Sequence, residues 1–292
     1  MKPDPRFLNQ PKHFWANVRS ISQHSGYTNR NTKQIKVHDL PTIVKALGQI
    51  GLGTGHVVDP NGKPTTLGEA LTAYFAYRAD VLNTFVEPRL MDAKQAAEAF
   101  ARVQKTTKPK LPVTMNKQKG KKKKPAYLTN IVNWLIDDNC GGVQFDYDPR
   151  KLTTFTQGGM PLRTLARRVD GAFPAAVNPI AVWEIKEYYH TTTFGSRVAD
   201  GVYETLLDGM ELEELRTAER VECKHYLMVD AYYTWWDCGR SYLCRIIDML
   251  NMGYVDEVLF GTEVLDRIPS ITKDWAASLR ASRSGSKSCR FS

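Results

Sequence analysis

The chain has 292 residues, 42% of them hydrophobic, and a formal net charge of +9. This length allows a sizeable core, built as one large domain or two smaller ones, and no apolar run approaches the roughly 18 residues of a membrane span. The start of the chain lacks the apolar segment of a signal peptide. Five cysteines without paired metal-ligand spacing argue against both a disulfide framework and a zinc site. We therefore expect a soluble intracellular protein without a membrane partner.

The first region, residues 1–104, is expected to be a mainly helical accessory region. Apolar residues recur at helical spacing in residues 40–52, directly after Asp39, which has the position of an N-cap. A second helix is predicted over residues 66–86, where Thr66 and Glu69 have the spacing of a capping box, and a third over residues 90–103. The connection between the first two is longer than the turn of a helix-turn-helix motif, so the region is a candidate DNA-contacting region without that motif.

The first 38 residues of this region mix aromatic and basic side chains without a clear period. We expect this segment to pack loosely over the rest of the protein. Stacking of its aromatic rings on bases is the alternative interpretation.

Residues 105–125 contain nine lysines and no acidic residue. Their Pro, Gly, Thr and Asn content is typical of a flexible linker or an inserted loop. One interpretation is an arm that neutralises DNA phosphates, and the others are a solvated spacer or a nuclear-localisation signal. The lysines proposed to contact nucleic acid are Lys119, Lys121, Lys122, Lys123 and Lys124.

The remaining segments predict an α/β domain over residues 126–275, followed by a basic flexible tail over residues 276–292. The expected order is a helix at 126–139, a short strand at 143–147, two strands at 165–170 and 180–189 joined by a turn, a helix at 197–215, a strand at 224–235, a helix at 242–252 and a strand at 255–260. This order favours a central mixed β-sheet that is flanked by helices.

Three charged residues stand out on the two central strands. Because side chains alternate along a strand, Glu184 and Lys186 share one face of the second strand. Asp170 ends the first strand and can reach the same place if the two strands pair antiparallel. Two carboxylates beside a lysine are what a hard divalent cation and the water that it activates require. An exposed cross-strand ion pair is the alternative interpretation.

This set resembles the PD-(D/E)XK nuclease superfamily, which has the restriction-endonuclease-like fold. Val169 and Asp170 match the first half of the motif, with valine in place of proline. Residues 184–186, Glu-Ile-Lys, match the second half. The resemblance covers residues 126–261 and implies an α/β, restriction-endonuclease-like core. It also implies that Asp170, Glu184 and the carbonyl of Ile185 hold Mg²⁺, while Lys186 positions or activates the attacking water.

Two other acid-x-Lys triplets occur in the chain, at residues 92–94 and 222–224. The first lies in an Ala-rich segment that is predicted to be helical. The second has Asp208 at the matching upstream position, but Asp208 falls in a Leu- and Glu-rich segment that also reads as helical. Only the central triplet has its upstream acid on a neighbouring strand.

Further residues are candidates for supporting roles. His190 and Arg197 lie just beyond the motif strand, where they could meet a phosphate, and ordinary surface polarity is the alternative. Many family members carry an additional acid on the first core helix. The residues available there are Asn130, Asn133, Asp137 and Asp138, and the sequence does not choose among them.

The resemblance implies a Mg²⁺-dependent endonuclease that hydrolyses phosphodiester bonds of double-stranded DNA. A site-specific type II restriction endonuclease fits the size, the helical accessory region and the absence of a P-loop motif. The alternatives are a low-specificity defence or repair nuclease and a DNA-binding protein with an inactive nuclease core. A homodimer is the family's usual way of cutting both strands, and we expect a cytoplasmic location in a prokaryotic cell.

Overall fold

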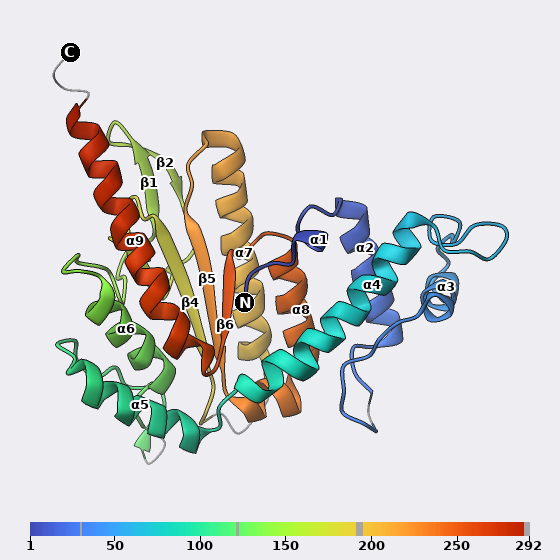
Figure 1. Ribbon diagram of the computed structural model, residues 1–292, viewed down its shortest axis with the longest axis horizontal. Coiled ribbons are helices and arrows are strands. Elements are labelled where there is room, and N and C mark those ends of the chain that lie inside the picture. Colours follow the sequence, from blue (N-terminus) through green and yellow to red (C-terminus); the bar gives the residue numbers. More distant parts are fainter. Residues whose placement is uncertain (30, 121–122, 191–194, 289–292) are drawn as a thin grey trace. The chain divides into compact units, whose positions relative to one another are not determined.

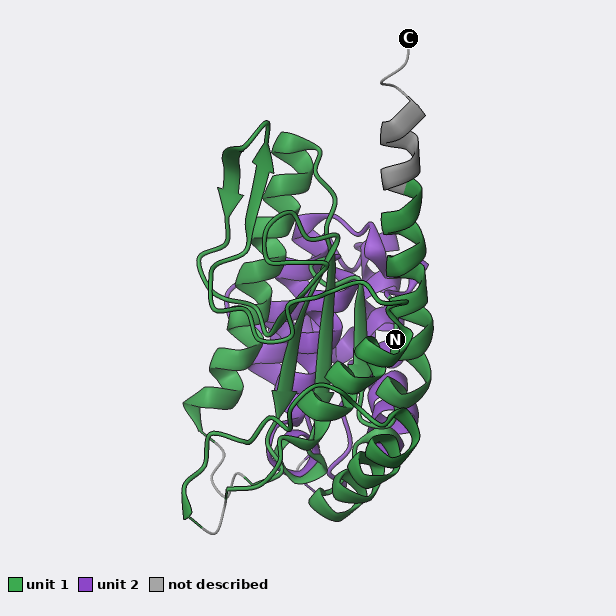
Figure 2. Ribbon diagram, turned by 90° about the vertical axis from the view of Figure 1, so that its left-hand side faces the viewer, with its two compact units in different colours: residues 1–2, 89–234, 254–292 green, residues 3–88, 235–253 purple. Residues whose placement is uncertain are grey.

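The computed structural model describes residues 1–29, 31–120, 123–190 and 195–288. The chain divides into two compact units (Figure 2). Unit 1 comprises residues 1–2, 89–234 and 254–292, and unit 2 comprises residues 3–88 and 235–253. These cuts lie at other positions than the expected regions: residues 89–125 fold with the sheet, and residues 235–253 fold with the N-terminal helices.

Unit 2 is helical. Its elements are α1 (Pro5–Leu8), α2 (Lys12–Ser25), α3 (Leu40–Gln49), α4 (Thr66–Asp80), the π-helix η1 (Val81–Val86) and α8 (Arg240–Asn251). Asp39 caps α3 as predicted, since its side chain accepts a hydrogen bond from the backbone N–H of Thr42. The capping-box prediction was displaced by one residue, because the N-cap of α4 is Thr65, which accepts from Gly68.

The expectation for the first 38 residues was wrong. Residues 12–25 form the amphipathic helix α2, whose buried face joins the core of unit 2. That face consists of Phe14, Trp15, Val18 and Ile21, each at most 5% exposed. The aromatic rings therefore pack against one another and are not available for stacking on bases.

A buried ion pair holds α8 to α4 inside unit 2. The Arg78 guanidinium donates to both carboxylate oxygens of Asp248, at 3.0 and 3.1 Å. Tyr74 donates to the same carboxylate, and Arg78 also donates to the hydroxyl of Ser22. A fully buried guanidinium needs such partners, and this explains why residues 235–253 fold with segments that lie far away in the sequence.

Unit 1 is an α/β unit with a mixed four-stranded sheet (Figure 1), as predicted. The strand order is β3 (Gly171–Phe173), β4 (Ala181–Glu187), β5 (Lys224–Asp230) and β6 (Glu257–Phe260). β3 is antiparallel to β4, and the other two pairs are parallel. A separate hairpin pairs β1 (Thr154–Gln157) with β2 (Met160–Thr164).

Several predicted strands have other bounds in the structure. Residues 165–170 form no strand, and β3 begins only at Gly171. Residues 143–147 make one isolated bridge, between Asp146 and Ala172. β5 ends at Asp230, after which the π-helix η4 (Tyr233–Cys238) takes up the aromatic residues. The hairpin β1–β2 was not predicted.

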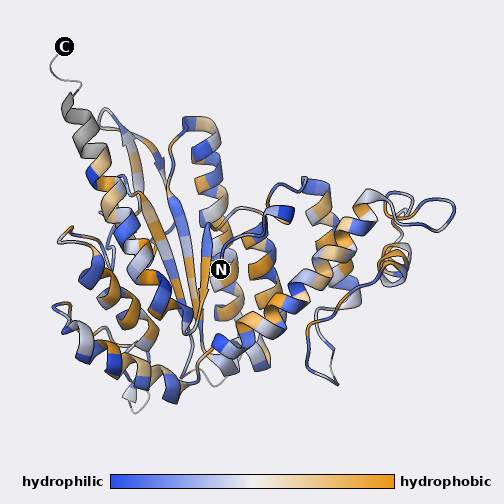
Figure 3. Ribbon diagram, in the orientation of Figure 1, coloured by the Kyte–Doolittle hydropathy of each residue, from blue (hydrophilic) through white to orange (hydrophobic). Residues whose placement is uncertain are grey.

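Helices cover both faces of the sheet. α5 (Ala93–Thr107), α6 (Tyr127–Asn139) and α9 (Glu263–Ser288) lie over one face, and α7 (Ser196–Glu219) lies over the other (Figure 1). Hydrophobic and hydrophilic residues alternate along these helices (Figure 3), which is the pattern of amphipathic helices. The short helical turn η2 (Glu87–Arg89) precedes α5.

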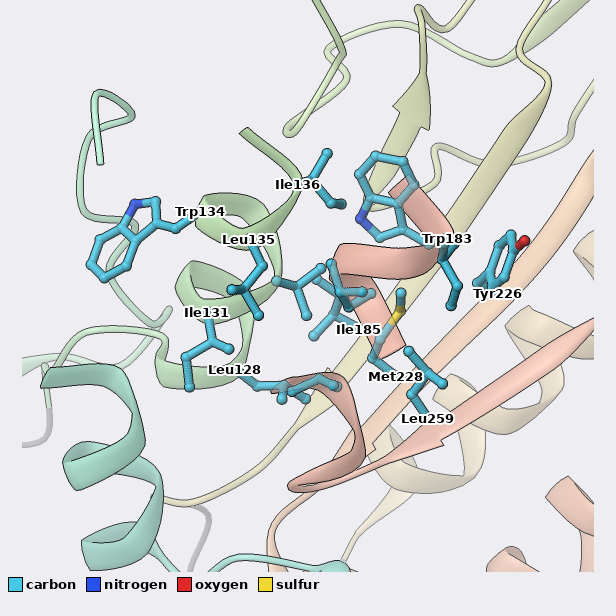
Figure 4. Packing of buried hydrophobic residues seen from close by; sticks show 14 of the residues in the cluster. Leu128, Ile131, Trp134, Leu135, Ile136, Trp183, Ile185, Tyr226, Met228 and Leu259 are labelled. Carbon is cyan, nitrogen blue, oxygen red and sulfur yellow. The ribbon is translucent and has the colours of Figure 1, made fainter. Parts of the chain in front are cut away.

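The α6 side of the sheet is apolar. Figure 4 shows side chains of α6 packed towards side chains from β4, β5 and β6. The labelled contacts include Leu128 and Leu135 from α6, and Trp183, Ile185, Met228 and Leu259 from the strands. Gly171 lies opposite Trp183 across the β3–β4 pair, and a Cβ at residue 171 would come within 2.1 Å of the indole ring. β3 therefore needs glycine at this position.

The lysine-rich segment is an inserted loop of unit 1. Met115 and Pro125 form an isolated antiparallel bridge across it. Asn130 of α6 ties the base of the loop, because it accepts from the Thr114 N–H and donates to the Thr114 carbonyl. Within the described residues, no helix combines the length and the apolar content that crossing a bilayer requires.

Candidate active site

The structure brings Asp170, Glu184 and Lys186 together at one place in unit 1. Glu184 and Lys186 lie on the face of β4 that is turned towards α7, and Asp170 directly precedes β3. Two crossed hydrogen bonds clasp the chain here: the Ile185 N–H donates to the Asp170 carboxylate at 2.8 Å, and the Asp170 N–H donates to the Glu184 carboxylate at 3.1 Å. Antiparallel pairing of β3 with β4 produces this convergence.

Glu184 is the centre of the cluster. It is fully buried, and Lys186 Nζ lies 2.7 Å from its Oε2 while Arg167 Nη1 lies 2.9 Å from its Oε1. Burial alone would raise the pKa of Glu184, but the charges of Lys186 and Arg167 outweigh burial and lower it. Glu184 therefore stays ionised in the interior.

Helix α7 supplies two acids that the sequence did not assign to the site. Glu204 lies 3.2 Å from Lys186 Nζ and 3.3 Å from Arg167 Nη2. Asp208, which is fully buried, lies 2.5 Å from Arg167 Nη1. Their spacing of four residues puts Glu204 and Asp208 on one helix face. That spacing was the available signal, and Arg167 had the signal of lying three residues before Asp170.

Negative charge exceeds positive charge in this cluster. Four carboxylates (Asp170, Glu184, Glu204 and Asp208) face two cations (Arg167 and Lys186). Burial and the charge of Glu184 raise the pKa of Asp170 to about 6, and the same two causes raise the pKa of Asp208 to about 7. Asp208 Oδ1 has no hydrogen-bond partner within the described part of the chain. An additional cation would relieve this excess.

The donors present fit a hard divalent cation. Within the described residues, no group of three or more His, Cys, Asp and Glu side chains is arranged to hold a metal ion, but a set of two carboxylates and one carbonyl does not require such a group. The N–H and C=O of a strand residue leave the same edge of the strand. Since the Ile185 N–H meets Asp170, the Ile185 carbonyl lies on the Asp170 side. Carboxylate and carbonyl oxygens are the ligands that Mg²⁺ prefers.

The backbone of α7 fixes the position of Lys186. Gly201 packs against the aliphatic part of this side chain, because a Cβ at residue 201 would lie 3.1 Å from Lys186 Cδ and 2.9 Å from the Tyr188 hydroxyl. Tyr188 in turn donates to the carbonyl of Arg197. Burial would lower the pKa of Lys186, but Glu184 and Asp170 raise it, so the ammonium stays charged.

The candidate nucleic-acid-binding residues have different positions. Lys119, Lys123 and Lys124 are exposed on the inserted loop, whereas Lys121 and Lys122 lie outside the described residues. His190 follows β4, with its ring 5.8 Å from that of Tyr127. Burial and the neighbouring charge of Lys124 lower the pKa of His190. The structure thus brings His190 near the end of the lysine loop, and Arg197 is exposed at the start of α7.

Other acids considered from the sequence have separate roles. Asp137 and Asp138 line a cavity of about 590 Å³ on the α6 side of the sheet, away from the face that carries Glu184. Asp92 caps α5 through a capping box with Gln95. Glu187 points to the opposite face from Lys186 and accepts from the backbone and hydroxyl groups at the start of α6. It completes a helix N-terminus that has no side-chain cap of its own.

The comparisons with known proteins concern families only. Residues 1–85 match a family model described as Domain of unknown function (DUF7690). Neither a curated protein nor a solved structure matches the chain. A second family model matches residues 91–275, which include the whole candidate site. The chain therefore belongs to the family described as Domain of unknown function (DUF7687).

Proposed function

We propose that this protein is a Mg²⁺-dependent endonuclease that hydrolyses phosphodiester bonds of double-stranded DNA. The observation that carries the proposal is the convergence of Asp170, Glu184 and Lys186 around crossed hydrogen bonds at the start of β3. The succession α6, β3, β4, α7 and β5, with β4 parallel to β5, supports a restriction-endonuclease-like core.

Asp170, Glu184 and the Ile185 carbonyl would hold the metal ion. When bound, Mg²⁺ supplies polarisation of the scissile phosphate and a lowered pKa of a coordinated water. The buried ammonium of Lys186 lies beside Glu184, where it can orient the attacking water and offset the negative charge that develops on the phosphate. A compact ammonium suits this position better than a planar guanidinium.

Arg167 has a different role in this proposal. Its guanidinium binds Glu184 and Asp208 together, so it holds the Glu184 carboxylate in place from the α7 side. It also shares the negative charge that a metal ion needs. We expect Arg167 to position Glu184 and to limit how tightly the site binds cations.

Digestion of plasmid and bacteriophage DNA with purified protein tests the proposal. We expect cleavage with Mg²⁺ and none with EDTA. Discrete bands indicate a site-specific type II restriction endonuclease, and a smear indicates a low-specificity defence or repair nuclease. DNA binding without cleavage in Mg²⁺ contradicts the proposal and favours a binding protein with an inactive nuclease core.

The chain offers a matched control for the site. Glu184→Gln should abolish cleavage, since it removes a charged metal ligand. Glu222→Gln alters the acid of another Glu-x-Lys triplet, which is exposed and lies outside the cluster. It should leave cleavage unchanged. Equal loss of cleavage in both variants would remove the assignment to Glu184.

A further inference from the structure

A second basic segment leads directly into the candidate active site. Residues 149–169 contain five cations and no acid. These cations are Arg150, Lys151, Arg163, Arg167 and Arg168. The segment ends next to Asp170, and an acid-free basic segment in that position is an electrostatic footprint of nucleic acid binding.

Most of this segment forms the rigid hairpin β1–β2. Gly158 and Gly159 make the turn with φ of 57° and 86°, as a two-residue turn of this hand requires. Asn178 clamps the middle of β1, because it accepts from the Thr156 N–H at 2.7 Å and donates to the Thr156 hydroxyl at 2.8 Å. The hairpin is therefore organised before any ligand binds.

The base of the hairpin is anchored beside the candidate site. Phe155 and Leu165 are buried in a cluster with Val182 and Leu212. Val182 lies two residues before Glu184 on β4, so the two side chains share one face of the sheet. Arg163 of β2 pairs with Glu214 of α7 at 2.7 Å. The hairpin thus rises from the α7 face of β4, close to Glu184.

The tip of the hairpin and its flanks are exposed. Residues 157–161 are all exposed, and Met160 is 63% exposed. Lys151 and Arg168 are also exposed, and neither makes an ion pair within the described residues. A polar tip with cations near its base suits a ligand that presents acceptor-rich edges between rows of phosphates.

The dimensions agree with such a ligand. From Leu165 to the turn, the strand spans about 20 Å at roughly 3.3 Å per residue. The major groove of DNA is about 12 Å wide and admits a two-stranded β-ribbon. A hairpin that starts at the phosphate-cleaving site can therefore reach base edges in the adjacent groove.

We propose that the β1–β2 hairpin enters the major groove of duplex DNA, with Gln157 at the base edges and Lys151 and Arg168 on the flanking phosphates. A glutamine amide can pair with the edge of adenine through two hydrogen bonds. The proposal rests on the proposed nuclease function and names the element through which that site meets its substrate.

Binding of a fluorescent duplex to the full chain in Ca²⁺ tests the proposal without cleavage. Gln157→Ala combined with Met160→Ala should weaken binding about tenfold. Lys151→Ala and Arg168→Ala should each lower the slope of log K against log salt by about 1. The matched controls Lys273→Ala on α9 and Arg102→Ala on α5 remove exposed cations from the other side of the sheet. They should bind as the wild type does.

The outcomes separate this proposal from the proposed function. If the wild type binds DNA and the hairpin variants bind equally well, the hairpin proposal is overturned and the nuclease proposal stands. If the wild type binds no duplex, the nuclease proposal fails with it. A changed oligomeric state of the tip variant, with unchanged DNA affinity, would assign the hairpin to a protein contact and overturn the proposal. Unchanged melting temperatures of all variants exclude misfolding as the cause.

Discussion

Each compact unit contains a buried ionic cluster, and the two clusters differ in how their charges are balanced. In unit 2, one guanidinium (Arg78) meets one carboxylate (Asp248), and neutral hydroxyls complete the set. In unit 1, two cations face four carboxylates around Glu184. Buried charges are tolerated when they are paired, so the first cluster is complete whereas the second retains an excess of negative charge.

The difference separates a structural role from a functional one. The Arg78–Asp248 pair joins α4 to α8 and needs no additional partner. The cluster at Glu184 keeps two acids with a raised pKa, Asp170 and Asp208, inside the protein. Perturbed acids of this kind gather at functional sites. The predictions below test whether the two clusters behave differently.

The largest effect on stability is expected from breaking the balanced pair. Asp248→Ala leaves the Arg78 guanidinium buried without its counter-ion, and the free energy of unfolding should fall by about 3–5 kcal/mol. Urea denaturation measures this change. Arg78→Met combined with Asp248→Leu should recover much of the loss. If Asp248→Ala unfolds at the wild-type urea concentration, the pair has no structural role.

The corresponding change in the unbalanced cluster should affect cleavage more than binding. Lys186→Ala removes the ammonium beside Glu184, and the cleavage rate in Mg²⁺ should fall about 10²–10³-fold. DNA affinity in Ca²⁺ should remain nearly unchanged, because few phosphate contacts are lost. Gel assays of cleavage and of binding measure the two effects. Equal loss of both, with a lowered melting temperature, would indicate a folding defect instead.

A third buried carboxylate, Asp230, has only neutral donors. It accepts hydrogen bonds from the Met91 N–H and from Tyr189, and burial raises its pKa to about 7 from 3.8. The folded protein therefore keeps a proton that the unfolded chain releases, so this group lowers the free energy of unfolding as pH rises from about 4 to 7. Asp230→Asn should reduce that fall by about 2–4 kcal/mol in urea titrations at pH 4 and pH 7.5. Parallel profiles for the two proteins would contradict the assignment.

The smallest expected effect concerns the cation that shares Glu184. Arg167→Gln removes a positive charge from the cluster, and the affinity for Ca²⁺ should rise about tenfold in titration calorimetry. Arg267→Gln is the matched control, since Arg267 pairs with Glu257 elsewhere in unit 1. It should leave the affinity unchanged. Unchanged or weaker Ca²⁺ binding by Arg167→Gln would show that the excess charge does not serve cation binding.

Local features of the chain were read correctly from the sequence. The cap at Asp39, the helix over residues 126–139 and the strand that carries Glu184 and Lys186 all form near the predicted positions. Caps and side-chain alternation depend on residues a few positions apart, so a single sequence contains them. Errors occurred where partners are remote: residues 165–170 gave up strand pairing because Asp170 instead contacts β4 with its backbone and carboxylate.

The candidate site shows the same limit. Asp170, Glu184 and Lys186 were chosen from motif and context, and the antiparallel pair β3–β4 brings them together. Arg167, Glu204 and Asp208 were not assigned to this site, because a loop and a helix contribute them from opposite sides of the motif. Asp208 was even considered for the triplet at residues 222–224. Only the crossover of α7 onto β4 shows which acid meets which cation.

The sequence by itself determined the α/β class of the sheet region, the helical N-terminal region and the pairing of Glu184 with Lys186 on one strand face. These follow from periodicity, since side chains repeat every two residues in a strand and about every 3.6 in a helix. Tertiary structure alone decided that residues 235–253 join the N-terminal helices, and that four carboxylates gather around two cations. Both depend on burial and on charges far apart in the chain, whose interaction energies exist only once folding removes water from between them.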